Sequence, residues 1–292
     1  MSPFVIAIVI TSTFMHAGWN LIARYERSES QVYKKVLIFI GLVGFVPAVI
    51  SEWMTRSMTP LAWACVTGAG ICAGFYLFFL AKAFESSDFT IVYPVARSLP
   101  VILIAVIDTL RGRYLTAYGW MGILLVAAGC VLVPLSSFRD ISLGRYINRT
   151  SLWMLLTALG TVGYTFLDKV AAEVVQSGPA TAARYGYFYF LISFFPYILL
   201  LHFFGSQGSR ENTASWKISI PVAILGFSAY WLILWAYQLS PYAGYIYAFR
   251  QFSIVIGAVL AFIIYKEKGV VVRMTGALLI TGGLVLIGLL GT

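Results

Sequence analysis

The chain has 292 residues, of which 60% are hydrophobic and 11% are charged, and its formal net charge is +9. Soluble domains carry roughly 25% charged residues, so this composition excludes an ordinary soluble domain and is typical of a polytopic membrane protein. The basic residues are scattered over the connections between apolar runs, which argues against a nucleic-acid-binding surface.

Apolar runs recur along the whole chain, each near the ~20 residues that cross a hydrocarbon core. They predict an all-α membrane protein with ten transmembrane helices, at 3–22, 33–51, 61–82, 89–110, 117–135, 151–170, 185–204, 217–238, 244–265 and 271–291. The connections are too short to fold into a soluble domain, so any function is expected to lie within the helices. The first run has no basic residues before it, unlike a signal peptide, and we expect a retained helix.

The first predicted helix carries His16, Trp19 and Asn20 at spacings of three and four, which places them on one face. We expect this face to point inward. His16 could relay protons, but a hydrogen bond across helices is the preferred interpretation.

The fourth predicted helix contains the sequence YPVARSLP, in which Arg97 stands between Pro94 and Pro100. An arginine near the bilayer centre costs about 3 kcal/mol on insertion scales, so it usually faces a cavity or a partner. Interior prolines remove helical hydrogen bonds. We therefore expect the prolines to bend or break this helix so that Arg97 faces a cavity.

No carboxylate is evident at the centre of the first or sixth predicted helix. Asp108 and Asp168 lie toward helix ends beside Arg111 and Lys169, and local pairs with these cations are expected to satisfy them. A proton-coupled exporter of lipophilic cations needs a buried carboxylate. The sequence therefore favours neutral, zwitterionic or anionic cargo.

The second half of the chain repeats the first. At an offset of 153 Arg97 matches Arg250, and at an offset of 154 the pair Gly122 and Gly129 matches Gly276 and Gly283. Because five spans are an odd number, the copies are expected to have inverted topologies, as in alternating-access transporters. We predict a first repeat at 1–138, a connecting loop at 139–150 and a second repeat at 151–292.

Arg97 and Arg250 are the sharpest candidate site residues. As equivalent positions of inverted repeats they are expected to approach one central region, where two guanidinium groups suit carboxylate, sulfonate or phosphate oxygens. The alternative is that each arginine binds helix-end carbonyls or a carboxylate and holds the bundle together. Further expected cavity residues follow: Tyr93, Trp231, Trp235, Tyr247 and Gln251.

The distribution of basic residues over the connections predicts how the chain is oriented in the membrane. Twelve follow odd-numbered spans and five, including Lys169 and Arg184, lie on the other side, so the positive-inside rule places both termini outside. Cys65, Cys72 and Cys130 lack ligand spacing, so no metal or cofactor is expected.

The duplicated five-helix unit, the Trp19-Asn20…Arg24 helix end, and the ends Leu110-Arg111-Gly112-Arg113 and Tyr265-Lys266-Glu267-Lys268 before Gly-rich helices resemble the EamA family of the drug/metabolite transporter superfamily. The resemblance covers essentially the whole chain. It implies a ten-helix inner-membrane transporter of small metabolites, often an exporter of amino acids, with cytoplasmic termini, opposite to the charge count.

Three functions stay open at this point. The leading one is a secondary transporter or facilitator of a small polar metabolite, such as an amino acid or organic acid, acting as a monomer or homodimer. A multidrug exporter of lipophilic cations is the rival within transport. A membrane scaffold or an intramembrane enzyme is the rival outside it, and an enzyme is not expected because His16 and His202 belong to no catalytic set.

Overall fold

The computed structural model describes residues 1–23, 29–84, 89–135, 137–138, 149–205, 214–265 and 270–291, and these contain helices but no strand. The helices are α1 (Pro3–Ala23), α2 (Glu29–Thr55), α3 (Pro60–Phe84), α4 (Phe89–Leu110), α5 (Ala117–Leu132), α6 (Arg149–Ala172), α7 (Pro179–Phe204), α9 (Trp216–Leu239), α10 (Ala243–Arg250), α11 (Phe252–Tyr265) and α12 (Val270–Leu290). Each predicted span corresponds to one of these helices, except that the ninth span is divided into α10 and α11.

Seven helical segments of the described chain are long and apolar enough to cross a membrane. The protein is therefore a multi-pass membrane protein. In lipid every backbone polar group needs an internal partner, which an α-helix supplies. The 16 residues of α5 are fewer than the ~20 of a full span, and the count of ten spans stays an expectation.

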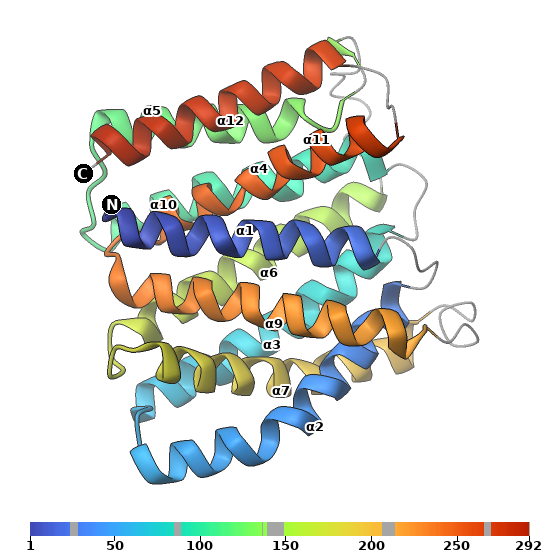
Figure 1. Ribbon diagram of the computed structural model, residues 1–292, viewed down its shortest axis with the longest axis vertical. Coiled ribbons are helices and arrows are strands. Elements are labelled where there is room, and N and C mark those ends of the chain that lie inside the picture. Colours follow the sequence, from blue (N-terminus) through green and yellow to red (C-terminus); the bar gives the residue numbers. More distant parts are fainter. Residues whose placement is uncertain are drawn as a thin grey trace.

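Consecutive helices alternate in direction, except that α11 continues in the direction of α10 (Figure 1). Both termini and the described connections at 56–59, 111–116, 173–178 and 240–242 lie at one edge of the molecule (Figure 1). We call this the termini side. α4 ends here at Leu110, and Gly112 follows with a φ of 79°, which suits glycine, while the Arg113 N–H donates to the Asp108 carbonyl at 2.9 Å.

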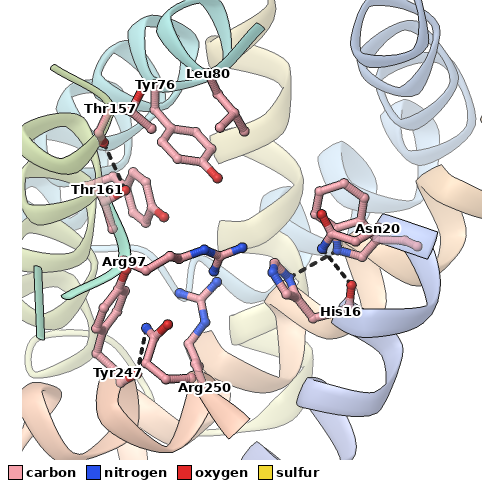
Figure 2. Close-up of a pocket in the computed structure, with 12 residues that line it drawn as sticks. His16, Asn20, Tyr76, Leu80, Arg97, Thr157, Thr161, Tyr247 and Arg250 are labelled. Carbon is pink, nitrogen blue, oxygen red and sulfur yellow. Dashed lines mark hydrogen bonds between the residues drawn. The ribbon is translucent and has the colours of Figure 1, made fainter. Parts of the chain in front are cut away.

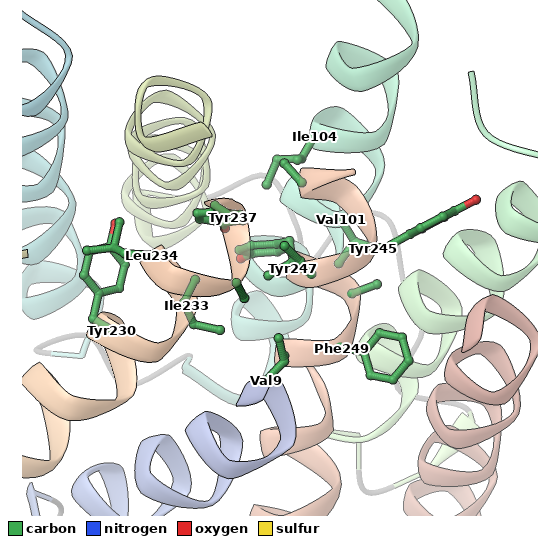
Figure 3. Close-up of a cluster of buried hydrophobic side chains, with 14 of the residues drawn as sticks. Val9, Val101, Ile104, Tyr230, Ile233, Leu234, Tyr237, Tyr245, Tyr247 and Phe249 are labelled. Atoms are coloured by element: carbon green, nitrogen blue, oxygen red, sulfur yellow. The ribbon is translucent and has the colours of Figure 1, made fainter. Parts of the chain in front are cut away.

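Helices that are distant in sequence pack against each other in pairs. α1 packs on α9 and α6 packs on α3, while α5 packs on α12 and α2 packs on α7. Buried side chains of α1, α4, α9 and α10 meet in one hydrophobic cluster (Figure 3), which includes Val9, Ile104, Ile233 and Phe249. This cluster lies beside the polar cavity described below.

Glycines bring α5 and α12 into close contact. A Cβ at Gly129 would lie 2.5 Å from the Gly276 carbonyl oxygen, and one at Gly122 would lie 2.7 Å from that of Gly283. Only glycine fits such a contact without a shift of backbone. α5 and α12 therefore pack directly against each other within one chain.

The prolines of the fourth helix do not break it. α4 runs from Phe89 to Leu110 through both prolines, and the interruption lies at Gln251 instead, between α10 and α11. The Gln251 side chain donates to the Tyr247 carbonyl at 3.3 Å, and the Ser253 hydroxyl donates to the Arg250 carbonyl at 2.9 Å. Side chains that compete for backbone carbonyls in this way interrupt a helix without proline.

Candidate functional site

The candidate site is a cavity at the middle of the bundle. It is lined by His16, Trp19, Asn20, Tyr76, Leu80, Arg97, Thr157, Thr161, Tyr164, Tyr247, Arg250 and Gln251 (Figure 2). These residues come from α1, α3, α4, α6 and α10, and Gln251 directly follows α10. The cavity volume is only about 40 Å³, room for a few water molecules, so a metabolite needs side chains or helices to move.

A second cavity of about 100 Å³ adjoins the first and shares His16, Tyr76, Tyr164 and Arg250 with it. Its wall is more aromatic and adds residues of α2, α7 and α9, the central ones being Tyr189, Phe190 and Tyr230. The rings of Tyr189 and Tyr230 lie 4.5 Å apart, and Tyr164 meets the Tyr76 ring edge-on at 5.6 Å. The two cavities therefore join a cationic region to an aromatic one.

The two arginines meet in the cavity. The guanidinium groups of Arg97, from α4, and Arg250, from the end of α10, point toward the same space (Figure 2). Arg250 Cζ lies 5.6 Å from the Tyr247 ring and 5.8 Å from the Tyr230 ring, while its buried Nη1 has no hydrogen-bond partner among the described residues. Like charges repel strongly where water is scarce, so this arrangement favours an anion between them.

The α1 face points into the cavity, as expected. Trp19 Nε1 donates to His16 Nδ1 at 3.1 Å, and Asn20 Nδ2 donates to the His16 carbonyl at 2.7 Å. The bond to the His16 ring thus lies within α1, not across helices as the sequence suggested. Because Nδ1 accepts, the neutral ring carries its proton on Nε2, and this buried Nε2 has no partner in the described chain.

Gln251 contributes a further free polar atom. Its side chain is 1% exposed, and its Oε1 has no hydrogen-bond partner among residues that the structure describes. Arg250 Nη1, His16 Nε2–H and Gln251 Oε1 therefore offer two donors and one acceptor. Buried polar groups without partners are costly, so these three atoms are available to hydrogen-bond with a polar molecule in the cavity.

α6 forms the opposite wall. The hydroxyl of Thr157 donates to the Trp153 carbonyl at 2.8 Å and that of Thr161 donates to the Thr157 carbonyl at 3.0 Å. Their donors are thus used within α6, and their oxygens can still accept. This wall presents neutral oxygens across from the guanidinium groups.

The expectation for the carboxylates is wrong. Asp168 is 1% exposed and accepts from the hydroxyls of Tyr185, at 2.9 Å, and Tyr230, instead of pairing with Lys169. Asp108 accepts from the Gly244 N–H at 2.7 Å. Neighbouring residues of a helix point in directions about 100° apart, so Asp168 and Lys169 reach different surroundings. The bundle does contain a buried carboxylate near the cavity.

Lys169 belongs to an ionic cluster at the termini side. It donates to the carbonyls of Tyr237, at 3.0 Å, and Ser240, at 2.8 Å, and its Nζ lies 3.2 Å from Glu173. Glu173 also pairs with Arg111 at 2.6 Å. Burial opposes ionisation of Glu173, but Lys169 and Arg111 outweigh it and hold the pKa of Glu173 below its usual value. This cluster ties the ends of α4, α6 and α9 together.

Arg184 was expected in the connection before the seventh span, but it lies inside a helix. α7 begins earlier than expected, at Pro179, so Arg184 lies inside it, where its Nε is 3.3 Å from Glu52 Oε2. It also donates to the hydroxyls of Ser57 and Ser51. Arg184 therefore joins α7 to α2, and together with the buried Lys169 it should not be counted as a topology determinant.

Two expected aromatic residues lie away from these cavities. Trp231 donates to the Pro179 carbonyl at 2.7 Å, and Trp235 meets the Phe4 ring edge-on at 5.4 Å. α9 turns Tyr230 toward the second cavity, and the next residue points in another direction. Tyr93 belongs to α4, but its side chain lies outside the described residues.

Sequence reasoning missed Asp168 as a site residue. A signal was present, since Thr161, Thr165 and Asp168 recur at helical spacing and share one face of α6. All three are buried in the structure. A polar stripe in the middle of a membrane helix indicates an inward face.

Comparison with solved structures identifies other chains with a similar fold. Of 26 solved chains that match, one, described only as "Crystal structure of protein", superposes with a TM-score of 0.71 at 16% identity, over 100% of this chain and 99% of that chain. At this identity the likeness shows the fold alone. No family model and no curated protein match the sequence.

Proposed function

We propose that this protein is a secondary transporter or facilitator that moves a small polar metabolite across the inner membrane by alternating access. The observation that carries the proposal is the convergence of Arg97 and Arg250 on one enclosed cavity with unpartnered polar atoms. The guanidinium groups bind an anionic group of the cargo, and the cargo is an amino acid or organic acid. The chain is a carrier and not an enzyme.

The architecture proposed is ten spans in two inverted five-helix repeats. Matching the helices in order pairs α1 with α6, α3 with α9 and α5 with α12. The α1–α9 contact then has its counterpart in the α6–α3 contact. The glycines show the same reciprocity. Gly122 faces Gly283 and Gly129 faces Gly276, and the repeat that matches Gly122 with Gly276 and Gly129 with Gly283 turns the first contact into the second. Reciprocal contacts of this kind support a two-fold relation between antiparallel halves.

The narrowness of the cavity supports a moving carrier. Its volume of about 40 Å³ is smaller than a metabolite, and the ionic cluster around Glu173 joins the ends of α4, α6 and α9 on the termini side. Parting of these helices at that cluster would widen the bundle toward the cavity, a movement that an open channel does not need.

The test uses purified protein and the probes glutamate, succinate and taurine. We expect at least one probe to raise the melting temperature of the wild type and to lose this effect in Arg250→Ala, with a partial loss in Arg250→Lys, which keeps the charge but not the planar fork. Lys217→Ala, at an exposed lysine outside both cavities and outside the cluster around Glu173, is the control and should bind like the wild type. The proposal fails if no probe stabilises the wild type, or if Arg250→Ala binds and transports normally at equal membrane abundance.

A second candidate is an exporter of lipophilic cations, favoured by one observation. The buried Asp168 among Tyr185, Tyr189 and Tyr230 supplies the carboxylate and aromatic rings that such cargo requires. Tetraphenylphosphonium binding that is lost in Asp168→Asn and kept in Arg250→Ala would favour this candidate over the first.

A further inference from the structure

Asp168 is a buried carboxylate whose partners are neutral. Its two oxygens accept from the hydroxyls of Tyr185 and Tyr230, and it forms no ion pair among the residues described. A buried ionised carboxylate without a cation is costly, whereas hydroxyl partners can serve the charged and the neutral acid alike. The site is thus chemically suited to gain and lose a proton.

Tyr230 links this carboxylate to the cavity. Its hydroxyl donates to Asp168, its ring lies 5.8 Å from Arg250 Cζ, and it lines the aromatic cavity. Tyr230 thus contacts Asp168 through its hydroxyl and faces Arg250 with its ring, so the carboxylate and the guanidinium share one neighbour. Ionisable groups on the surrounding helices are Cys65 and Cys72 of α3, Arg97 and Asp108 of α4, Tyr164 and Lys169 of α6, Tyr185 and Tyr189 of α7, Tyr230 and Tyr237 of α9, and Tyr247 and Arg250 of α10.

We propose that Asp168 is the proton-binding residue of a proton-coupled cotransport cycle, in which one proton moves together with the anionic cargo held at Arg97 and Arg250. The proposal rests on the proposed function and adds the coupling ion. The proton comes from water on one side of the membrane and returns to water on the other, so no further reactant is needed.

Two effects of protonation favour the anion. Neutral Asp168 no longer offsets the charge of Arg250, so the cavity becomes more positive. The acid O–H also donates to the Tyr230 oxygen, which releases the Tyr230 hydroxyl proton from the carboxylate and lets it donate toward the cavity. Proton and anion therefore strengthen the binding of each other, and by linkage the two effects are equal.

His16 is the rival proton site and must be separated from Asp168. Its Nδ1 accepts from Trp19, so a second proton on the ring would add positive charge beside the arginines. That charge would also favour an anion at low pH. The pH dependence of anion binding alone does not choose between the two residues, so variants of both are needed.

The experiment measures binding of glutamate and taurine to the purified protein between about pH 6 and 8, where neither probe changes charge. In the wild type we expect affinity to rise as pH falls, by up to about tenfold per pH unit, with uptake of up to about one proton per bound anion. Asp168→Asn, which resembles the neutral acid, should bind tightly at pH 8 without proton uptake. His16→Gln should keep the pH dependence.

Two further variants sharpen the test. Tyr230→Phe keeps the ring beside Arg250 but removes the hydroxyl, and should weaken the pH dependence even if Asp168→Asn fails to fold. Asp108→Asn alters a second buried carboxylate, which accepts from Gly244 outside the cavity, and should leave proton uptake unchanged.

Three results would overturn the proposal. They are pH-independent binding by the wild type, proton uptake that persists in Asp168→Asn, and a pH dependence that disappears in His16→Gln but survives in Asp168→Asn. Absence of glutamate, taurine and succinate binding at every pH would instead remove the proposed function, and the coupling with it.

Discussion

The contact between α5 and α12 gives a sharp prediction, because two neighbouring glycines of α12 differ in their surroundings. A Cβ at Gly283 would lie 2.6 Å from the Gly122 carbonyl oxygen and 2.9 Å from Val126 Cγ2, whereas one at Gly282 meets no atom within 4 Å. Alanine in place of glycine favours a helix interior by about 0.5–1 kcal/mol at either position. This common gain cancels when the two variants are compared with each other.

The remaining difference measures the helix contact. Overpacking typically costs about 1–3 kcal/mol, so Gly283→Ala should have a free energy of unfolding lower than that of Gly282→Ala by about this amount. Unfolding in mixed micelles, followed by circular dichroism, measures the difference. Gly129→Ala should behave like Gly283→Ala, since its Cβ would lie 2.5 Å from the Gly276 carbonyl oxygen. Equal stabilities of Gly282→Ala and Gly283→Ala would refute the reasoning.

Two further predictions concern charged groups outside the cavity. Arg184→Met leaves the buried Glu52 without its cation and should lower the free energy of unfolding by about 3–5 kcal/mol. The double variant Glu52→Gln/Arg184→Met should lose less stability than the sum of the two single changes. Additive losses in this double-mutant cycle would contradict a direct pair. Glu173→Gln should be less stable than the wild type above pH 4.5, the usual pKa of glutamate, because the lowered pKa of Glu173 means that the ionised form stabilises the fold. The gap should close as pH falls below that value through the lower folded pKa, and a gap that widens in acid during thermal unfolding would show that the sign is wrong.

The helices could be predicted from the sequence because membrane spans have one dominant signal, a run of apolar residues of the right length. The convergence of Arg97 and Arg250 was also predictable, since a repeat offset carries geometric information. Pro94 and Pro100 did not identify the interrupted helix, because α4 continues through both of them. The interruption at Gln251 depends on side-chain bonds to carbonyls, which apolar patterns do not reveal.

The partner of each carboxylate could not be predicted in the same way. Asp168 and Lys169 are neighbours in sequence, and a local pair is the simplest expectation for such residues. The tyrosines that hold Asp168 come from α7 and α9. Such contacts depend on how far each helix is rotated about its axis, and a largely apolar sequence constrains that rotation weakly.

The different contacts of Asp168 and Lys169 restrict how α6 can move. Asp168 anchors one side of α6 to hydroxyls beside the cavity, while Lys169 anchors the next side to the carbonyls at the end of α9. A rigid helix cannot roll by a fraction of a turn without displacing both side chains at once. Any rotation of α6 about its axis therefore moves the contacts beside the cavity and those of the ionic cluster on the termini side together, through one rigid turn of helix.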